Sequence, residues 1–316
     1  MKGRALEILV TGGAGFIGSH LVEALLRDGH AVRVLDDFSS GARGNLKTVA
    51  RDAEVMRGDC ADPRAAARAV RGVEAVFHEA AVPSVAVSVN DPARSHRAGA
   101  TATLNMLLAA RDAGVRRFIY AGSSSVYGDT PRLPKVESMA PCPLSPYAVS
   151  KLTGEAYVRL FSSLYGMETL TLRYFNVFGP RQNAGSPYSG VISLFTTAFL
   201  DGRTPVINGD GRQSRDFTYV DNVVQANRLA LTARGLAGQT VNVATGKRVT
   251  LLDLLRALAA ITGRPAKARH RPVRAGDVRH SLADIRLARR LLGYRPTVDF
   301  KTGLARTVEW YRSVNG

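Results

Sequence analysis

A tyrosine and a lysine lie four positions apart in the stretch SPYAVSKLTGE, residues 145–155. Ser145 is a good N-cap residue and Pro146 suits the first helical position, so a helix is predicted to begin here. Tyr147 and Lys151 then lie on one face of that helix, close enough to interact. A neighbouring ammonium lowers the pKa of a phenol from its ordinary value near ~10, and such a tyrosine can act as a general base. The alternative is a structural tyrosine with a solvated lysine.

Three glycines in the stretch LVTGGAGFIGSH, Gly12, Gly15 and Gly18, follow a predicted strand and open a predicted helix. Such a loop lets the main chain approach a pyrophosphate, whose charge the helix N-terminus stabilises. The next predicted strand ends at Asp36. A carboxylate there binds a ribose 2′-hydroxyl and repels a 2′-phosphate, so the predicted cofactor is NAD rather than NADP. The alternative is that the glycines only form a tight turn.

Further residues are expected to line the cofactor site. Asp37 adds a second negative charge beside Asp36. Asp59 and Cys60 follow the third predicted strand and are expected at the adenine end, although Asp59 is equally placed to cap the next helix. The other predicted cofactor contacts are Phe16, Ile17, Ala80 and Ala81.

These residues must be positioned by alternating strands and helices. Strands are predicted at 6–11, 31–36, 53–58, 74–80, 116–122 and 167–175. Helical stretches are predicted between them, most clearly at 15–28, 63–71, 94–113 and 146–166. Strands that alternate with helices imply right-handed βαβ units, so the predicted fold class is α/β, a doubly wound parallel sheet of the Rossmann type.

The later part of the chain is less regular. Loops rich in Gly, Pro and Asn precede predicted helices at 250–262 and 284–292. We predict an NAD-binding domain over 1–176, with a later segment near 217–245 returning to it. Residues 177–216 and 246–316 are predicted to form a smaller α+β substrate-binding domain.

Composition limits the classes of function. The 316 residues carry a net charge of +17, and no apolar run reaches the roughly 18 residues of a membrane span. The basic residues alternate with acids on amphipathic segments, which favours a solvated basic surface over a nucleic-acid interface. Cys60 and Cys142 have neither metal-ligand spacing nor a disulfide pattern. The first residues lack a signal-peptide pattern, so we expect a cytoplasmic protein without metal, membrane or nucleic-acid partners.

Several motifs together resemble the extended short-chain dehydrogenase/reductase family. They are the glycine loop, SSSVYG from Ser123 to Gly128, and the tyrosine–lysine pair. The stretches HEAA, LRYFNVFGPRQ, INGDGRQSRDFTYVDNVVQAN and RAGDVRHSLAD resemble nucleotide-sugar 4-epimerases, most closely the UDP-N-acetylglucosamine and UDP-glucose 4-epimerases. The resemblance covers essentially the whole chain.

The resemblance implies roles for individual residues. Ser123 would bond the reacting sugar oxygen, Tyr147 would be the base, and Lys151 would lower its pKa and hold the nicotinamide ribose. Phe175 would lie near the nicotinamide. The implied contacts to the nucleotide diphosphate are Asn176, Arg215, Arg274 and Asp277. Further substrate contacts are expected at Ser84, Ser125, Val191, Asn208 and Ser281.

The two positions after Ser123 indicate which reaction is expected. Related dehydratases carry an acidic pair there and the decarboxylases usually carry a glutamate, whereas this chain has Ser124 and Ser125. Reversible C4 epimerisation of a UDP-sugar through a 4-keto intermediate is therefore expected. The candidate pairs are UDP-GlcNAc with UDP-GalNAc and UDP-glucose with UDP-galactose. The alternatives are a UDP-glucuronate or other nucleotide-sugar epimerase, a dehydratase or decarboxylase, and a non-enzymatic NAD-sensing protein.

The chain departs from the family pattern at three positions. Relatives usually carry asparagine at Gly99, glycine at Ala102, and glycine or lysine at Pro83. Ser281, seven positions after Arg274, matches a position near the sugar C2 substituent, and its small side chain predicts room for an acetamido group. The alternative is that Ser281 caps the following helix. The helices at 94–113 and 146–166 match those that pair across a two-fold axis in relatives, so a homodimer is expected.

Overall fold

The computed structural model describes residues 4–183, 190–273 and 278–315. A seven-stranded sheet, in the order β11-β6-β5-β4-β1-β2-β3, forms its centre, and every neighbouring pair is parallel. The strands are β1 (Glu7–Thr11), β2 (Ala31–Asp36), β3 (Ala53–Arg57), β4 (Ala75–His78), β5 (Arg117–Ser123), β6 (Glu168–Tyr174) and β11 (Gln239–Val243). The order reverses between β1 and β4, as in doubly wound folds.

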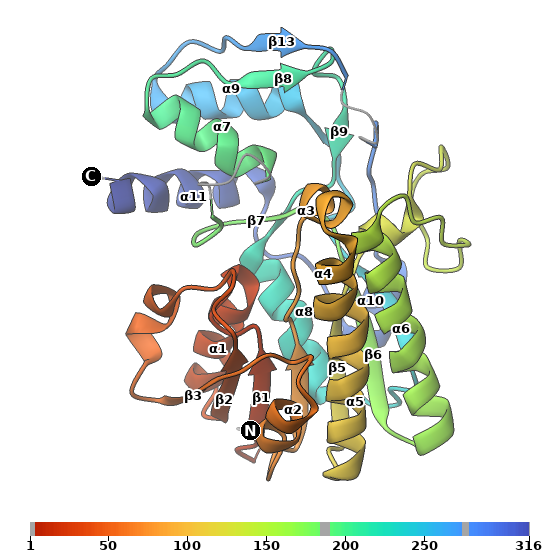
Figure 1. The fold of residues 1–316 in the computed structure, drawn as a ribbon. Helices are drawn as coiled ribbons and strands as arrows, with labels where there is room; N and C mark the ends of the chain where they lie inside the picture. The colour runs from red at the N-terminus through yellow and green to blue at the C-terminus, as the bar shows by residue number, and fades with distance from the viewer. Residues whose placement is uncertain (1–3, 184–189, 274–277, 316) are drawn as a thin grey trace.

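Helices cover both faces of this sheet (Figure 1). One face packs against α1 (Phe16–Arg27) and α8 (Val220–Thr232), and the other against α2 (Pro63–Ala69), α5 (Ala102–Asp112) and α6 (Pro146–Tyr165). Side chains alternate along a strand, so Val10 lies in the first apolar core and Leu9 in the second, each fully buried. The predicted α/β fold class is confirmed.

The helix predicted at 94–113 is confirmed as a continuous helical stretch from Pro92 to Asp112, which contains a π-helical turn. The structure has α3 (Val85–Asn90), α4 (Pro92–His96), a π-helical turn η2 (Arg97–Thr101) and then α5. A Cβ added at Gly99 in the π turn would lie 2.6 Å from the Ser150 hydroxyl of α6. This backbone therefore requires glycine at position 99, and the departure from the family pattern follows from the close approach of η2 to α6.

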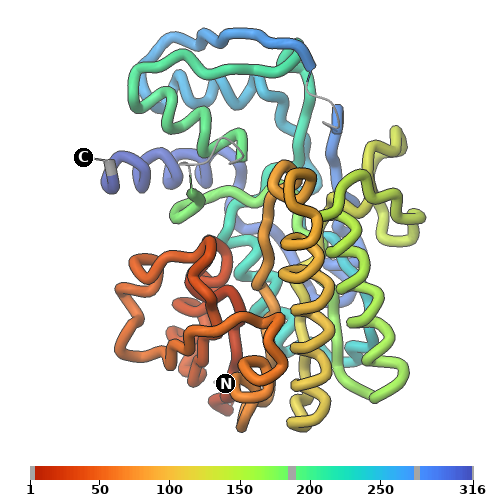
Figure 2. The backbone as a smooth tube through the Cα atoms, in the orientation of Figure 1, coloured from red at the N-terminus to blue at the C-terminus, as the bar shows by residue number. Residues whose placement is uncertain are grey.

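A second group of elements lies beyond the carboxyl ends of the strands (Figures 1 and 2). Its helices are α7 (Val191–Leu200), α9 (Leu251–Thr262) and α11 (Phe300–Asn315). Its short strands form the pairs β7 (Val177–Phe178) with β10 (Thr218–Tyr219), β9 (Ser214–Arg215) with β12 (Val249–Thr250), and β8 (Val206–Asn208) with β13 (Arg269–Arg271). Between them the chain returns through α8 and β11 to the sheet. The helix α10 (Arg286–Leu292) also packs against β11 and α8, so it lies with the sheet rather than with this second group of elements.

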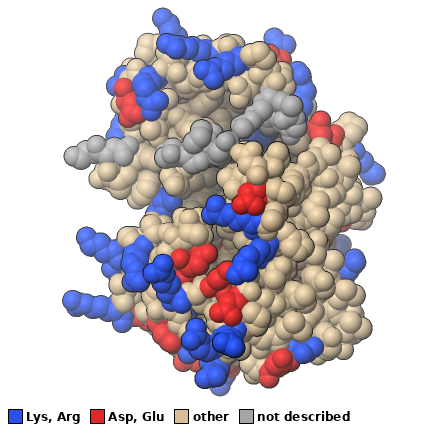
Figure 3. Space-filling view, in the orientation of Figure 1, with Lys and Arg blue, Asp and Glu red and all other residues tan. Residues whose placement is uncertain are grey.

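Two short 3₁₀ helices complete the described elements, η1 (Arg43–Val49) after β2 and η3 (Ser124–Tyr127) directly after β5. Within the described ranges, no helix combines the length and apolarity that crossing a bilayer would need. Lys and Arg side chains are spread over the visible surface and interleaved with Asp and Glu (Figure 3).

Candidate active site

The glycine loop lies where β1 ends and α1 begins, at the carboxyl edge of the sheet. Gly12 has a φ of +66°, and an added Cβ there would lie 2.8 Å from the Ala80 Cα. Gly15 precedes α1 without a side-chain cap, so the N–H groups of Phe16, Ile17 and Gly18 open the helix with no side-chain acceptor. A 12-residue helix with a bare N-terminus beside a cradle without Cβ atoms fits a dinucleotide pyrophosphate.

Asp36 ends β2 next to this loop and is 6% exposed. Its carboxylate accepts hydrogen bonds from the Ala14 N–H at 2.9 Å and the Phe38 N–H at 2.8 Å. Burial raises the pKa of Asp36, while the two N–H donors lower it. The carboxylate is thus fixed beside the glycine loop, and Asp37 next to it accepts from the Ser39 N–H.

The structure decides between the two interpretations of Asp59. Asp62, not Asp59, caps α2, because its side chain accepts from the Arg64 N–H. The capping alternative for Asp59 was therefore wrong. Asp59 forms an ion pair with Arg97 of η2, with 2.8 Å between Oδ2 and Nη2. Cys60 beside it is buried, and burial raises the pKa of its thiol.

The predicted catalytic residues come from β5 and α6. Ser123 is the last residue of β5, and Tyr147 and Lys151 lie in the first two turns of α6. The predicted start of that helix is confirmed, since the Ser145 hydroxyl accepts from the Ala148 N–H at 3.2 Å and Pro146 follows at the first helical position. The C-terminus of β5 therefore meets the N-terminus of α6 at the same sheet edge as the glycine loop.

Lys151 and Tyr147 have different partners in the structure. The Lys151 ammonium, 4% exposed, donates to the Ala121 carbonyl at 2.7 Å. Burial raises the pKa of Tyr147 and a hydrogen bond with Ser123 lowers it. The predicted lowering by Lys151 is not seen here, because the ammonium is directed at a main-chain carbonyl and interacts electrostatically with Glu79.

The Ser123 hydroxyl also has a neighbour within its own turn. It accepts from the Ser125 N–H at 3.2 Å and from the Ser125 hydroxyl at 2.9 Å. Because Ser125 supplies both donors, the Ser123 proton remains available for another acceptor. Ser84, a predicted substrate contact in the segment after β4, caps α3 by accepting from the Val87 N–H.

Asn176 and Ser281 lie together although 105 positions separate them. The Asn176 side-chain amide is 3.5 Å from the Ser281 hydroxyl and donates to the Asp216 carbonyl at 3.2 Å. Ser281 does not cap the following helix: α10 begins at Arg286 and its N-cap residue, Ile285, makes no side-chain cap. The capping alternative for Ser281 was wrong, and the hydroxyl instead lies next to a predicted substrate residue.

The other predicted substrate residues are spread over neighbouring segments. Arg215 ends β9, and its guanidinium donates to the carbonyls of Ser214 and Arg279. Val191 begins α7 and Asn208 ends β8. Phe175 is buried against Tyr127, with 6.1 Å between ring centroids. Ala81 follows β4 and is partly buried, whereas Arg274 and Asp277 lie outside the described residues.

Asp216, which the sequence analysis did not single out, organises this side of the site. Its fully buried carboxylate accepts from the N–H and hydroxyl of Thr245 and from the N–H groups of Gly246 and Ala283. These donors belong to two separate loops. Asp216 thereby fixes the segment that carries Ser281 against the segment that carries Arg215.

The sequence analysis assigned no role to His78 of the HEAA stretch. In the structure, both nitrogens of its ring have hydrogen-bond partners. Its Nδ1 lies 2.7 Å from the Thr11 hydroxyl and its Nε2 lies 3.1 Å from the Thr103 hydroxyl. Thr103 donates its own proton to the Gly99 carbonyl, so it accepts from Nε2–H, and Nδ1 accepts from Thr11. Burial lowers the pKa of His78 to about 3, which keeps the ring neutral.

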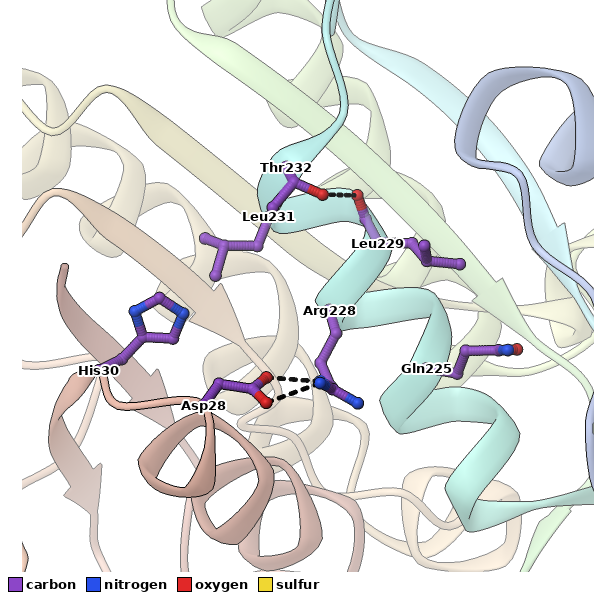
Figure 4. A pocket seen from close by; sticks show the side chains of 7 residues that line it. All are labelled: Asp28, His30, Gln225, Arg228, Leu229, Leu231 and Thr232. Atoms are coloured by element: carbon purple, nitrogen blue, oxygen red, sulfur yellow. Dashed lines mark hydrogen bonds and ion pairs between the residues drawn. The ribbon is translucent and has the colours of Figure 1, made fainter. Parts of the chain in front are cut away.

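A separate hollow of about 310 Å³ lies between the end of α1 and α8 (Figure 4). An ion pair between Asp28 and Arg228 crosses it, with Oδ2 and Nε 2.6 Å apart. It lies by the start of β2, at the sheet edge opposite the glycine loop, and none of the predicted site residues lines it. It is therefore not the site described above.

Comparison with known proteins identifies the family. The family model for the NAD dependent epimerase/dehydratase family matches residues 8–244. The chain belongs to this family. A member from Mycolicibacterium smegmatis, a UDP-glucose 4-epimerase, is 40% identical over 312 residues, which cover 98% of this chain and 99% of that protein.

Two solved structures of epimerases have closely similar folds. The UDP-N-acetylglucosamine 4-epimerase from Methanobrevibacter ruminantium in complex with UDP-N-acetylmuramic acid has a TM-score of 0.94 at 38% identity, covering 99% of this chain and 100% of that one. The UDP-glucose 4-epimerase with UDP-glucose from Thermotoga maritima has a TM-score of 0.94 at 38% identity, covering 98% and 100%. The predicted family, NAD as cofactor and an isomerase of the epimerase type are confirmed.

Proposed function

We propose that this enzyme reversibly inverts C4 of a UDP-sugar. The observation that carries the proposal is the meeting of Ser123, Tyr147 and Lys151 at the sheet edge beside the glycine loop. The neighbouring Ser124 and Ser125 supply no carboxylic acid, so elimination of water or loss of carbon dioxide lacks an acid–base group at these positions. Apart from a hydride acceptor, inversion without elimination requires only a base that takes and returns one proton.

Different residues of the chain remove the proton from the sugar and form hydrogen bonds with the sugar and the cofactor. Tyr147 takes the proton of the sugar 4-hydroxyl, and Ser123 bonds the same oxygen with the proton that its contact with Ser125 leaves available. The glycine loop and Asp36 would hold NAD+, which would supply the hydride acceptor for C4. The buried ammonium of Lys151, one helical turn along α6 from Tyr147, would donate to ribose hydroxyls and would favour the phenolate when Tyr147 loses its proton.

The substrate is a UDP-sugar, and we propose the pair UDP-GlcNAc and UDP-GalNAc with the non-acetylated pair also accepted. Arg215 is suited to phosphate oxygens, because a guanidinium binds them in a planar fork. Ser281 beside Asn176 is small, so the side of the pocket that it lines leaves room for an acetamido group. Similarity to epimerases whose names include both sugars supports this breadth.

A homodimer is part of the proposal. One face of α6 carries Val149, Ala156, Leu160 and Leu164 at helical spacing, and three of them, Val149, Leu160 and Leu164, are 45–67% exposed. A row of exposed leucines and a valine on a 20-residue helix is an apolar surface that a second copy of the chain would cover. The helix α5 packs beside α6 in the same layer. An isologous contact would pair this face with itself.

The test of the function is incubation of purified protein with separate UDP-sugars and NAD+, followed by chromatographic separation of products. The panel contains UDP-GlcNAc, UDP-glucose and UDP-glucuronate. We expect the C4 epimers of the first two and no 4-keto-6-deoxy or decarboxylated product. UDP-glucuronate as the best substrate would favour the alternative epimerase, and NAD binding without turnover of any sugar nucleotide would favour a sensing protein.

A further inference from the structure

A carboxylate that the proposed chemistry does not use lies beside the catalytic lysine. Glu79 directly follows β4, which pairs in parallel with β5 so that His78 is opposite Tyr120. The next residues along these two strands are Glu79 and Ala121. The Ala121 carbonyl is the group that accepts from the Lys151 ammonium at 2.7 Å. Glu79 and Lys151 therefore lie near the same point of the sheet edge, where they interact electrostatically without forming a close ion pair.

The Glu79 carboxylate is fixed by partners from two other elements. The Tyr174 hydroxyl of β6 donates to Glu79 Oε1 at 2.7 Å, and the Asn227 amide of α8 donates to the Tyr174 oxygen at 2.8 Å. Asn227 and Tyr174 are buried. Burial raises the pKa of Glu79 to about 7, while the Tyr174 hydrogen bond and the charge of Lys151 lower it. Both partners therefore favour the carboxylate, which is the form of the side chain that accepts without donating.

Among the described residues, Glu79 is the carboxylate whose charge acts on Lys151. Among the groups facing the lysine, His78 of β4 is neutral and Tyr120 of β5 presents its ring, 5.0 Å from Nζ. Tyr174 of β6 faces Glu79 rather than the lysine. Burying an ammonium without a countercharge is costly, so a carboxylate at this place stabilises the charged lysine.

We propose that Glu79 is a positioning residue that keeps Lys151 protonated and held at the Ala121 carbonyl, with the Asn227–Tyr174 pair holding the carboxylate in place. The effect of Glu79 on Lys151 is independent of the reaction, whereas its effect on catalysis rests on the proposed epimerase function. A protonated Lys151 is the form that stabilises the Tyr147 phenolate and donates to ribose hydroxyls, so Glu79 sets the upper pH at which the site stays competent.

The test measures the lysine directly. The chain has seven lysines, so protein labelled with ¹³C at lysine Cε gives a short spectrum in which a Lys151→Met variant assigns the Lys151 signal. We expect Glu79→Gln, which keeps an acceptor for Tyr174 but removes the charge, to lower the pKa of Lys151 by about one unit or more. Glu79→Asp, which keeps the charge, should hold the pKa within about half a unit of wild type.

A pKa of Lys151 that does not move in Glu79→Gln would overturn the proposal, as would an equal fall in Glu79→Asp and Glu79→Gln. Tyr174→Phe removes a neutral donor but keeps the Glu79 carboxylate. The pKa of Lys151 should therefore be higher in Tyr174→Phe than in Glu79→Gln. With a turned-over UDP-sugar, the alkaline limb of kcat/KM should move to lower pH in Glu79→Gln by the same amount. The titration needs no turnover, so failure of the epimerase assay would count against the proposed function alone.

Discussion

The Lys151 ammonium donates to the main-chain carbonyl of Ala121, two residues before Ser123 on β5. The bond ties the first turns of α6 to the end of β5. Ser123 follows Ala121 on β5 and Tyr147 precedes Lys151 on α6, so this bond helps to keep the hydroxyl and the phenol in their relative position. The catalytic lysine therefore has a structural role in addition to its charge.

Asp36 should make the protein select NAD over NADP. Its buried carboxylate is fixed by two N–H donors and would repel a 2′-phosphate. We expect wild type to bind NAD at least about tenfold tighter than NADP in calorimetry after removal of co-purified cofactor, a ratio worth ~1.4 kcal/mol. Asp36→Asn should reduce the preference for NAD over NADP, and Asp37→Asn should reduce it less than Asp36→Asn does. Equal affinities in wild type would show that β2 has been misinterpreted.

Ser281 should set tolerance for the N-acetyl group. Ser281→Tyr places a ring next to Asn176, so kcat/KM for the acetylated pair should fall roughly tenfold or more relative to the non-acetylated pair. Ser281→Ala, which removes only the hydroxyl, should retain the acetylated activity to within a few-fold. An unchanged acetylated activity in Ser281→Tyr would place the pocket elsewhere.

Stability should fall at acid pH because of His78. Burial lowers its pKa to about 3, whereas the unfolded chain takes up the proton near ~6.5. The unfolded state therefore binds more protons between these values, and the free energy of unfolding decreases as pH falls by up to ~1.4 kcal/mol per unit. In urea titrations at pH 7, 6 and 5, His78→Gln should lose less stability per unit than wild type. Parallel slopes would mean that the ring is protonated in the folded protein.

The exposed face of α6 should hold a homodimer together. Light scattering at micromolar concentration should give the mass of two chains for wild type, and Leu160→Glu should give one, because it places a charge in the apolar contact. Val314→Glu on α11, also at an exposed apolar residue, is the matched control and should remain dimeric. A monomeric wild type would refute the assembly.

Local patterns in the sequence were sufficient for the sheet, the glycine loop and the start of α6. Ser145 and Pro146 specify a helix start through contacts within one turn, so the prediction needed no tertiary information. The partners of Asp216 and Lys151 are different. Asp216 takes its donors from loops 29–67 positions away, and Lys151 takes a main-chain carbonyl 30 positions away, which no residue pattern encodes.

The π turn inside the predicted helix at 94–113 also depends on a tertiary contact. A sequence of helix formers predicts a continuous helix, and the π turn at Arg97–Thr101 arises only where Gly99 meets Ser150 of a neighbouring helix. The departures from local prediction thus gather around the site, where tertiary contacts override local preference.

The measurement that tests the central claim most directly follows the C4 hydrogen. Wild type and Tyr147→Phe are incubated with UDP-GlcNAc and with UDP-glucose in D₂O, and the products are observed by proton NMR. The account predicts that wild type forms the C4 epimer with its C4 proton retained, because a hydrogen that moves as hydride would not exchange with solvent. Tyr147→Phe should bind NAD but turn over roughly 10²–10⁴-fold more slowly, since only the proton acceptor is lost. Deuterium at C4, or activity of Tyr147→Phe within a factor of about two of wild type, would contradict the account.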